Sequence, residues 1–434
     1  MARRPSVGAL LALAGALVAL PSRASEAEFS PSRSTDLSAL TQAVARHSPS
    51  TELDRLAVDA ARADARQVRL WTNPTLDGSW GTIPLGTTNP PGLARWRQVP
   101  NYGVGLSYTF TLGKRGPRAR MSDALVDAAR ANVVVGARAQ ALDLARTLGQ
   151  MAVAELRVIG LKSQLEEQKA AISVAESRLA TGFGTPLDVD RLRIERSRTE
   201  QQLIGNEGEL RAAAATCAAA VGIPCQLFRD GDEARAFLTA WITRAREAKA
   251  TPAERADVRA LDAAGRAAVA EAEVAKAQRI PDPTVRLGYL YDTFVISGNQ
   301  RQSLELSVSF PLPFFDSGQA ARDAAEARRR RSSSVRERLL QAARLRTEAL
   351  RATLEARERS HAVIVTETLP RARAVVGDLE KAATARLISV TDVIQARRTL
   401  SDLLIDEAEN HGDAFAVAVD LLAESGADSP RDLP

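Results

Sequence analysis

One stretch constrains the fold of this chain more than any other: a strand of strict alternation that leads into a very long helix. From Tyr102 to Leu112, apolar residues alternate with glycine, serine and threonine. This alternation predicts a β-strand with one apolar face and one face of small and polar residues. After a break at 113–117 the sequence favours helix to about Ala180 with no internal proline. At about 1.5 Å per residue this helix would be roughly 95 Å long, far beyond the helices of ordinary globular domains.

The same order of elements occurs twice. The first repeat, 25–225, is predicted to contain short helices at 35–70, strands at 74–82 and 102–112, a long helix at 116–180 and a returning helix at 187–221. The second repeat, 226–434, is predicted to contain short helices at 236–278, strands at 284–292 and 303–312, a long helix at 319–385 and a returning helix at 390–423. Landmarks such as Asn73-Pro-Thr-Leu76 and Asp282-Pro-Thr-Val285 match, which indicates an internal duplication. Pro370 lies inside the second long helix, where we expect a kink or a break.

Residues 1–24 have the pattern of a secretory signal peptide. Arg3 and Arg4 precede an apolar run from Val7 to Leu20, and a small residue, Ala24, ends the segment. The apolar run is too short to span a bilayer, and no cysteine follows it closely. We therefore expect an exported chain without a lipid anchor.

Charge on the chain is nearly balanced, with 58 basic and 53 acidic residues and a formal net charge of +5. The arginines, including the run Arg328–Arg331, are interleaved with Glu and Asp along predicted helices. This pattern is typical of solvated helix faces and argues against nucleic-acid binding. The sequence has no phosphate-binding glycine loop, nucleophile elbow or paired catalytic carboxylates, so we expect neither an enzyme nor a bound cofactor.

The few aromatic residues gather around the predicted strands. Aromatic residues make up 4% of the chain, yet all four tyrosines and three of the four tryptophans lie in or beside the two strand-loop-strand units. Such clustering is typical of the aromatic girdles of outer-membrane β-barrels. Because an open sheet edge is not stable in lipid, the four strands of one chain would have to be completed by further protomers. Two soluble hairpins, each packing one face on a core, are the alternative interpretation.

Over the mature sequence, this duplicated order resembles the TolC-type outer-membrane efflux proteins. Thr111-Leu-Gly-Lys-Arg115 is similar to the "LGGKR" segment of the heavy-metal (CzcC-like) members, with one glycine fewer. The stretch from Pro311 to Ala320 is similar to their "PLPLFDRNQG", with an altered end. The resemblance implies a mainly α fold with a membrane β-barrel. In that fold a trimeric, 12-stranded barrel, with four strands per chain, continues into a long periplasmic α-helical barrel.

The resemblance also implies a function. The chain would be an outer-membrane exit duct of a Gram-negative bacterium, with a large periplasmic portion and contact with outer-membrane lipid. A periplasmic adaptor and an inner-membrane RND-type pump for heavy metals or drugs would be its partners. Two alternatives stay open at this point: an outer-membrane channel of type I secretion, and a soluble periplasmic coiled-coil adaptor or scaffold.

By the same resemblance, the turns between the long and returning helices would dock the adaptor. These tip residues are Gly182, Gly184, Thr185, Pro186, Arg386, Leu387, Ile388 and Ser389. A second set would form interhelical links that keep the duct closed, namely Asp188, Arg191, Asp392, Gln395 and Arg397. Gln395 stands where the family pattern has a second aspartate, which speaks against cation trapping there. Asp188 and Asp392 also fit a local role, because acidic side chains stabilise helix N-termini.

Cysteine and histidine complete the set of candidate residues. In an exported chain, Cys217 and Cys225 could be disulfide-bonded or could be two buried thiols, and the sequence leaves both open. The three histidines, His47, His361 and His411, are far apart in the sequence and have no clustered thiols or carboxylates beside them. We therefore expect no metal site.

Overall fold

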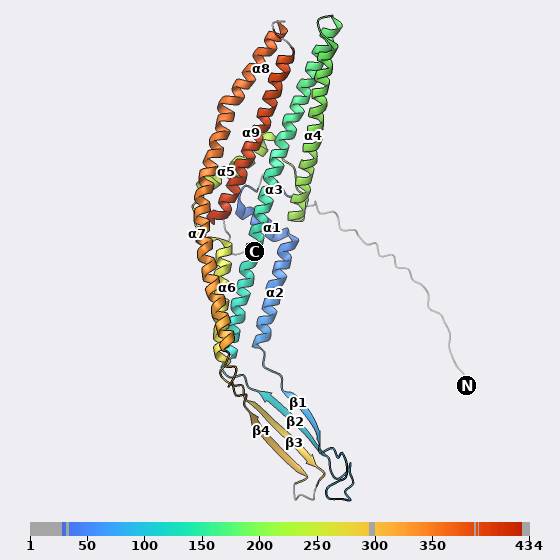
Figure 1. Cartoon of the computed structure of the whole chain (residues 1–434), viewed down its shortest axis with the longest axis vertical. Helices are drawn as coiled ribbons and strands as arrows, with labels where there is room; N and C mark the ends of the chain where they lie inside the picture. Colours follow the sequence, from blue (N-terminus) through green and yellow to red (C-terminus); the bar gives the residue numbers. More distant parts are fainter. Residues whose placement is uncertain (1–27, 32–33, 295–299, 386–387, 389, 428–434) are drawn as a thin grey trace, which may run out of the picture.

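The computed structural model describes residues 28–31, 34–294, 300–385, 388 and 390–427. The molecule is long and narrow, with a small sheet at one end and the tips of two helical hairpins at the other (Figure 1). The first repeat consists of α1 (Leu37–His47), α2 (Pro49–Arg69), β1 (Thr75–Gly81), β2 (Asn101–Thr109), α3 (Arg115–Ala180) and α4 (Pro186–Val221). The second consists of α5 (Gly231–Glu247), η2 (Pro252–Glu254), α6 (Ala256–Ala277), β3 (Thr284–Asp292), β4 (Gln302–Ser309), α7 (Gln319–Val363), η4 (Ile364–Thr368), α8 (Leu369–Thr384) and α9 (Val390–Ser425).

The four strands form one antiparallel sheet in the order β1-β2-β3-β4. Its central pair, β2 and β3, joins the two repeats, with Leu106 opposite Leu287. Two further leucines extend this row, because Leu76 pairs with Leu106 and Leu306 pairs with Leu287. A single register therefore places the apolar residues of both hairpins on one face of the sheet.

Both strand predictions that ran to residue 112 and residue 312 were too long. β2 ends at Thr109, and β4 ends at Ser309. Pro311 and Pro313 cannot donate ladder hydrogen bonds, which ends the pairing of β4. Beyond β2 the chain is held otherwise: the amide of Phe110 donates to the carbonyl of Pro283, and the amide of Leu112 donates to the Asp282 carboxylate.

Two helical hairpins, α3–α4 and the pair formed by α7–η4–α8 with α9, make up most of the length (Figure 1). The shorter helices α2 and α6 pack along α3, and α6 also packs along α7. Among the described residues no helix has both the length and the apolar composition needed to cross a membrane.

The main hydrophobic core lies midway along the molecule, where α1 and α5 pack against α3 and α9. Aromatic rings from α5 and α9 fill its centre, with Phe237, Trp241 and Phe415 in mutual contact and each at most 2% exposed. Gly149 of α3 lies directly under the Phe415 ring, so that a Cβ at this position would collide with it. The short helices α1 and α5 therefore fix the two hairpins relative to each other.

The second long helix is interrupted where the sequence predicts it. The segment η4 is one turn of π-helix just before Pro370, and the amide of Leu369 donates to the carbonyl of Ile364, five residues earlier. Pro370 has no amide hydrogen, and its ring would clash with the preceding turn of a regular α-helix. The wider π turn accommodates the proline without ending the hairpin.

Candidate functional site

The two faces of the sheet differ in chemistry, although Leu290 lies on the polar face. Leu76, Leu106, Leu287 and Leu306 are between 52% and 73% exposed on the apolar face. Aromatic side chains lie at both ends of that face: Trp80 stacks on Tyr102 near the loops, and Tyr108 contacts Phe110 near the helices. A soluble protein rarely leaves an apolar surface of this extent uncovered.

The opposite face carries small residues and one ionic row. Arg286 of β3 reaches over Gly105, donates to Asp77 of β1 at 2.6 Å, and also donates to Glu305 of β4 at 3.0 Å. A Cβ on Gly105 would lie 2.7 Å from the guanidinium, so the glycine provides the space for this bridge. The outer edges of the sheet are β1 and β4.

The Thr111–Arg115 motif joins the sheet to the helices. Lys114 is buried, and its Nζ lies 2.7 Å from Oδ2 of Asp282, which lies just before β3. Arg115 stacks over the Trp71 ring at 4.2 Å and donates to the carbonyl of Arg69. The motif therefore ties β2, β3 and α2 together at the base of α3.

The α3–α4 tip is a tightly capped turn. Gly182 takes a left-handed conformation with φ of 76°, its amide donates to Leu179, and the next amide, Phe183, donates to Arg178. These two bonds form the Schellman cap that favours glycine. The Phe183 side chain, which sequence reasoning did not single out, is 68% exposed at this tip.

The start of α4 contains the predicted Thr185, Pro186 and Asp188. Oγ1 of Thr185 accepts from the Asp188 amide at 3.2 Å and donates to the Asp188 carboxylate at 2.7 Å. Pro186 occupies the first turn, where its missing amide hydrogen costs nothing. Within the described residues, Asp188 makes these local contacts at its own helix start.

The second tip is described in part. Ile388 lies in a bend, whereas Arg386, Leu387 and Ser389 fall outside the described residues. Just before this tip, Arg178 at the end of α3 donates to the carbonyl of Ala383 at the end of α8 at 2.8 Å. This bond joins the two hairpins and was not predicted.

Of the predicted interhelical set, Arg397 makes contacts to other helices. Its guanidinium donates to Glu380 of α8 at 2.6 Å and to the carbonyl of Glu167 of α3 at 3.2 Å. Asp392 and Gln395 are exposed on α9. Arg191 is exposed on α4 and has no hydrogen bond or ion pair to another described residue.

The remaining charged and sulfur-containing candidates have structural roles. Cys217 and Cys225 are joined by a disulfide that closes the end of α4 onto the following segment. In the arginine run, Arg328 pairs with Glu271 of α6, and Arg329 pairs with Glu326 one turn away. The two arginine side chains are at least half exposed, in agreement with a solvated helix face.

Two of the three histidines, although far apart in the sequence, lie side by side in the structure. The antiparallel packing of α7 and α9 brings His361 beside His411, with ring centroids 4.6 Å apart. Nε2 of His361 lies 3.1 Å from Oε1 of Glu407, and Oε2 of the same carboxylate lies 3.4 Å from Nη2 of Arg235. A spacing of four residues puts Glu407 and His411 on one face of α9. That spacing, together with the predicted hairpin of the second repeat, is the feature of the sequence from which the cluster could have been found.

Burial tunes the titration of this cluster. Burial and the neighbouring His361 lower the pKa of His411 to about 4. For Glu407, burial opposes ionisation, but the hydrogen bond from His361 and the charge of Arg235 outweigh it and lower the pKa below its ordinary 4.5. At neutral pH the cluster therefore contains a carboxylate beside an uncharged His411 imidazole.

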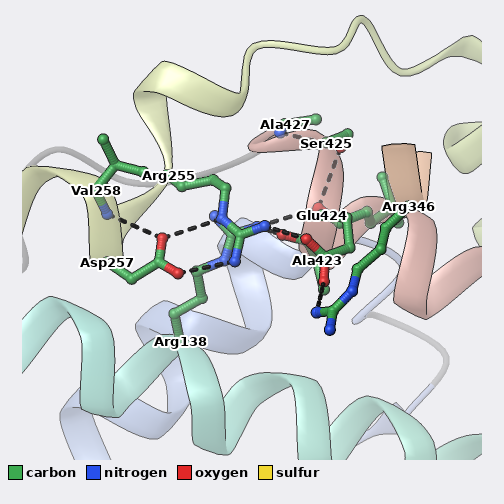
Figure 2. A network of polar contacts seen from close by, with 10 residues as sticks. Arg138, Arg255, Asp257, Val258, Arg346, Ala423, Glu424, Ser425 and Ala427 are labelled. Carbon is green, nitrogen blue, oxygen red and sulfur yellow. Dashed lines mark hydrogen bonds and ion pairs between the residues drawn. The ribbon is translucent and has the colours of Figure 1, made fainter. Parts of the chain in front are cut away.

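A second buried polar network lies where the C-terminus of α9 meets the start of α6 (Figure 2). Arg255 pairs with both Asp257 and Glu424, and Arg138 of α3 donates to the carbonyls of Leu422 and Ala423 at 3.1 and 3.3 Å. Burial opposes ionisation of Asp257, but the hydrogen bonds and charge of Arg255 outweigh it and lower the pKa of Asp257 below 3.8. The network fixes the sheet-proximal helices to the hairpins.

Comparisons with known proteins agree with this architecture. The family model described as outer membrane efflux protein matches residues 40–223, and no curated protein matches the sequence significantly. The solved structure of the outer-membrane channel OprN is 19% identical with a TM-score of 0.68, covering 93% of this chain and 94% of that chain.

Two further structures give the same result. The outer membrane protein VceC from Vibrio cholerae is 18% identical, with a TM-score of 0.66 and coverage of 90% of this chain and 96% of that chain. The MtrE outer membrane channel of Neisseria gonorrhoeae, in its open state, is 15% identical, with a TM-score of 0.66 and coverage of 92% and 90%. The chain, mainly helical with a small antiparallel sheet, has the fold of these outer-membrane channels along nearly its whole length.

Proposed function

We propose that this chain belongs to the TolC-type outer-membrane efflux proteins and is one protomer of a passive, trimeric exit duct. Substrate delivered by an inner-membrane pump would pass through a periplasmic helical sleeve and a β-barrel in the outer membrane. The observation that carries the proposal is the sheet: one face is apolar and exposed, the other is small and polar, and both edges are open.

The open edges favour a closed trimer. In lipid, every backbone amide and carbonyl has to be paired within the protein, so β1 of one protomer would pair with β4 of the next. Three protomers then give a barrel of twelve strands. The leucine row would face lipid between the two aromatic ends, and the row of Asp77, Arg286 and Glu305 would face the lumen.

The hairpin tips would be the docking end. Phe183 supplies an exposed apolar group at the α3–α4 tip, beside Gly182, Gly184, Thr185 and Pro186. Arg386, Leu387, Ile388 and Ser389 would supply the other tip, and a periplasmic adaptor would bind between the two. Asp392 and Gln395, both exposed near the start of α9, would face neighbouring helices of the sleeve together with Asp188 and Arg191.

The substrate class is heavy-metal ions or drugs, exported by an RND-type pump. Support comes from the sequence of the Thr111–Arg115 motif, which resembles a segment of the heavy-metal members. The contacts of Lys114 and Arg115 at the junction between sheet and helices give the motif a structural role. An association with a type I secretion pump, detected by co-purification, would instead assign the duct to polypeptide export.

The barrel is tested by two adjacent substitutions on β4, Leu306→Lys and Ser307→Lys. A lysine on the lipid face costs roughly 2–4 kcal/mol at the bilayer midplane, whereas a lumenal lysine is tolerated and changes ion selectivity. We expect Leu306→Lys to abolish assembly and Ser307→Lys to give a heat-modifiable trimer with altered selectivity in planar bilayers. Equal tolerance of both substitutions, or a water-soluble monomer without conductance, would reject the barrel.

The docking end is tested separately. Phe183→Ser removes the exposed apolar group of the tip, and we expect normal trimers that no longer cross-link to their adaptor. Asp392→Ala tests the closed state, because loss of an interhelical link there would raise single-channel conductance. An unchanged conductance in Asp392→Ala would remove this residue from the gate.

A further inference from the structure

The cluster of His361, Glu407 and His411 has the composition of a metal site. Two imidazoles and one carboxylate are a ligand set of zinc, and catalytic zinc sites of this composition leave the fourth position to water. Each residue can offer one ligand atom, and these atoms all lie within 4.8 Å of one another. Tetrahedral zinc ligands at about 2.0–2.1 Å from the metal are roughly 3.4 Å apart, so modest side-chain rotations would close the set.

An independent observation points to a ligand at this place. His411 is 5% exposed, and its Nδ1 is buried with no hydrogen-bond partner among the described residues. Buried polar atoms are rarely left unpaired, because each costs free energy. The other ring nitrogen of His411, Nε2, lies 3.3 Å from Oγ1 of Thr239 on α5. This is the arrangement of a metal ligand whose second nitrogen is held by an outer partner.

The surroundings leave one carboxylate oxygen for a cation. Arg235 contacts Oε2 of Glu407, while Oε1 faces His361 at 3.1 Å. The positive charge of Arg235 weakens the attraction for a metal ion but also orients the carboxylate. The His361 side chain is 25% exposed, so an ion can reach the cluster from solvent.

We propose that His361, Glu407 and His411 bind a divalent transition-metal ion of the zinc class and that the bound ion clips α7 to α9. The site lies in the helical body, and its first ligand is three residues before the π-helical segment η4. A bound ion would therefore anchor the hairpin directly next to its irregular turn. The proposal does not depend on the exit-duct function.

The test uses the full chain, purified in detergent without a histidine tag, stripped with a chelator and titrated with ZnCl₂. We expect one tightly bound zinc per protomer in the wild type and loss of that zinc in His411→Gln and Glu407→Gln. His47 is the third histidine of the chain and is exposed, so His47→Gln is the matched control and should keep its zinc. Wild-type protein without stoichiometric zinc, or variants that keep it, would overturn the proposal.

Two outer substitutions keep the test valid where a ligand variant fails to fold. Thr239→Val removes the partner of His411 Nε2 and should weaken zinc binding about tenfold without changing its stoichiometry. Arg235→Gln should strengthen zinc binding, because it removes the positive charge that competes with zinc for the Glu407 carboxylate. Substitution by Co²⁺ should give the visible absorption of a tetrahedral site in the wild type. Zinc affinity that is unchanged in both outer variants would show that the ion binds elsewhere.

Discussion

The two long helices begin at equivalent points of the two predicted repeats but lie in different environments. α3 runs unbroken for 66 residues and contacts α1, α2, α4, α5, α6 and α9, with buried residues along much of its length. α7 ends after 45 residues at the π turn and buries four of them. In Figure 1, α7 forms one side of the molecule, whereas α3 runs through its middle. Of the two long helices, one is therefore an interior helix and the other a surface helix.

The sequences of α3 and α7 differ accordingly at corresponding positions. The helices begin 204 residues apart, at Arg115 and Gln319. With that offset, three buried residues of α3, Leu144, Leu148 and Met151, correspond to exposed residues of α7, Glu348, Ala352 and Glu355. At these three positions α3 has large apolar side chains in the main core, whereas α7 has two glutamates and an alanine that are exposed.

The largest effect is expected from the interior helix. Leu148 is fully buried in the main core, and Leu148→Ala should lower the free energy of unfolding by about 2–5 kcal/mol, because transfer energy is lost and a cavity is left. Leu345 of α7 is 69% exposed, and Leu345→Ala should change it by no more than about 0.5 kcal/mol. Chemical denaturation of both variants measures the difference. Similar losses at the two positions would show that α7 is buried in the assembled protein.

The polar network of Figure 2 provides a second, smaller contrast between the same helices. Arg138 of α3 is 6% exposed and donates to the last carbonyls of α9, whereas Arg346 of α7 is 70% exposed and pairs with Glu424 at 3.2 Å. Arg138→Leu should cost about 1.5–3 kcal/mol, as expected for hydrogen bonds from a buried charged group.

Arg346→Leu is the matched variant and should cost about 0–1 kcal/mol, the range for an exposed ion pair. Both values come from the same denaturation experiment. A large loss in Arg346→Leu with none in Arg138→Leu would contradict the assignment of α3 as the interior helix.

Much of this arrangement could be predicted from the sequence, because periodicity and turn chemistry are local. Alternation between Tyr102 and Leu112 located the sheet, and Gly182 located the tip. The length of β4 was overestimated, because side-chain alternation continues through Pro311 although backbone pairing cannot. α5 begins at Gly231, before the predicted 236, because Asp230 caps the helix and accepts from the Glu233 amide.

The histidine cluster was missed for a different reason, since it depends on how two helices are paired. His361 lies 26 residues before and His411 lies 24 residues after residue 387, the midpoint of the α8–α9 turn. Counting along an antiparallel hairpin would have brought them together. The bond from Arg178 to Ala383 could not be found in this way, because it joins the two hairpins and depends on their relative placement.

Acid sensitivity should come from the start of α6, which packs between the two long helices. The folded pKa of Asp257 is lowered, so its ionised form stabilises the fold. This contribution is complete above the unfolded pKa, about 3.9, and is lost as the pH falls through the folded value. Denaturation between pH 7 and pH 3 should therefore show a steeper loss below about pH 4 in the wild type than in Asp257→Asn. Asp59→Asn, at an exposed aspartate of α2, is the control and should follow the wild type.

The smallest effect is expected at the π turn, where the question is why α7 is interrupted and α3 is not. A π turn can arise from one inserted residue or from a proline. The offset of 204 residues relates both the helix starts, Arg115 and Gln319, and the aspartates after the tips, Asp188 and Asp392. No residue was therefore inserted between these points, and Pro370 is the cause.

Pro370→Ala should restore an amide donor to the carbonyl of Thr366 and convert 364–368 to regular α-helix. It should raise the free energy of unfolding by about 1 kcal/mol or less, a fraction of the cost of an interior proline. Slower hydrogen exchange of the amides at 366–371, relative to the same segment in the wild type, would support this cause, whereas unchanged exchange and stability would mean that packing against α9 imposes the π turn.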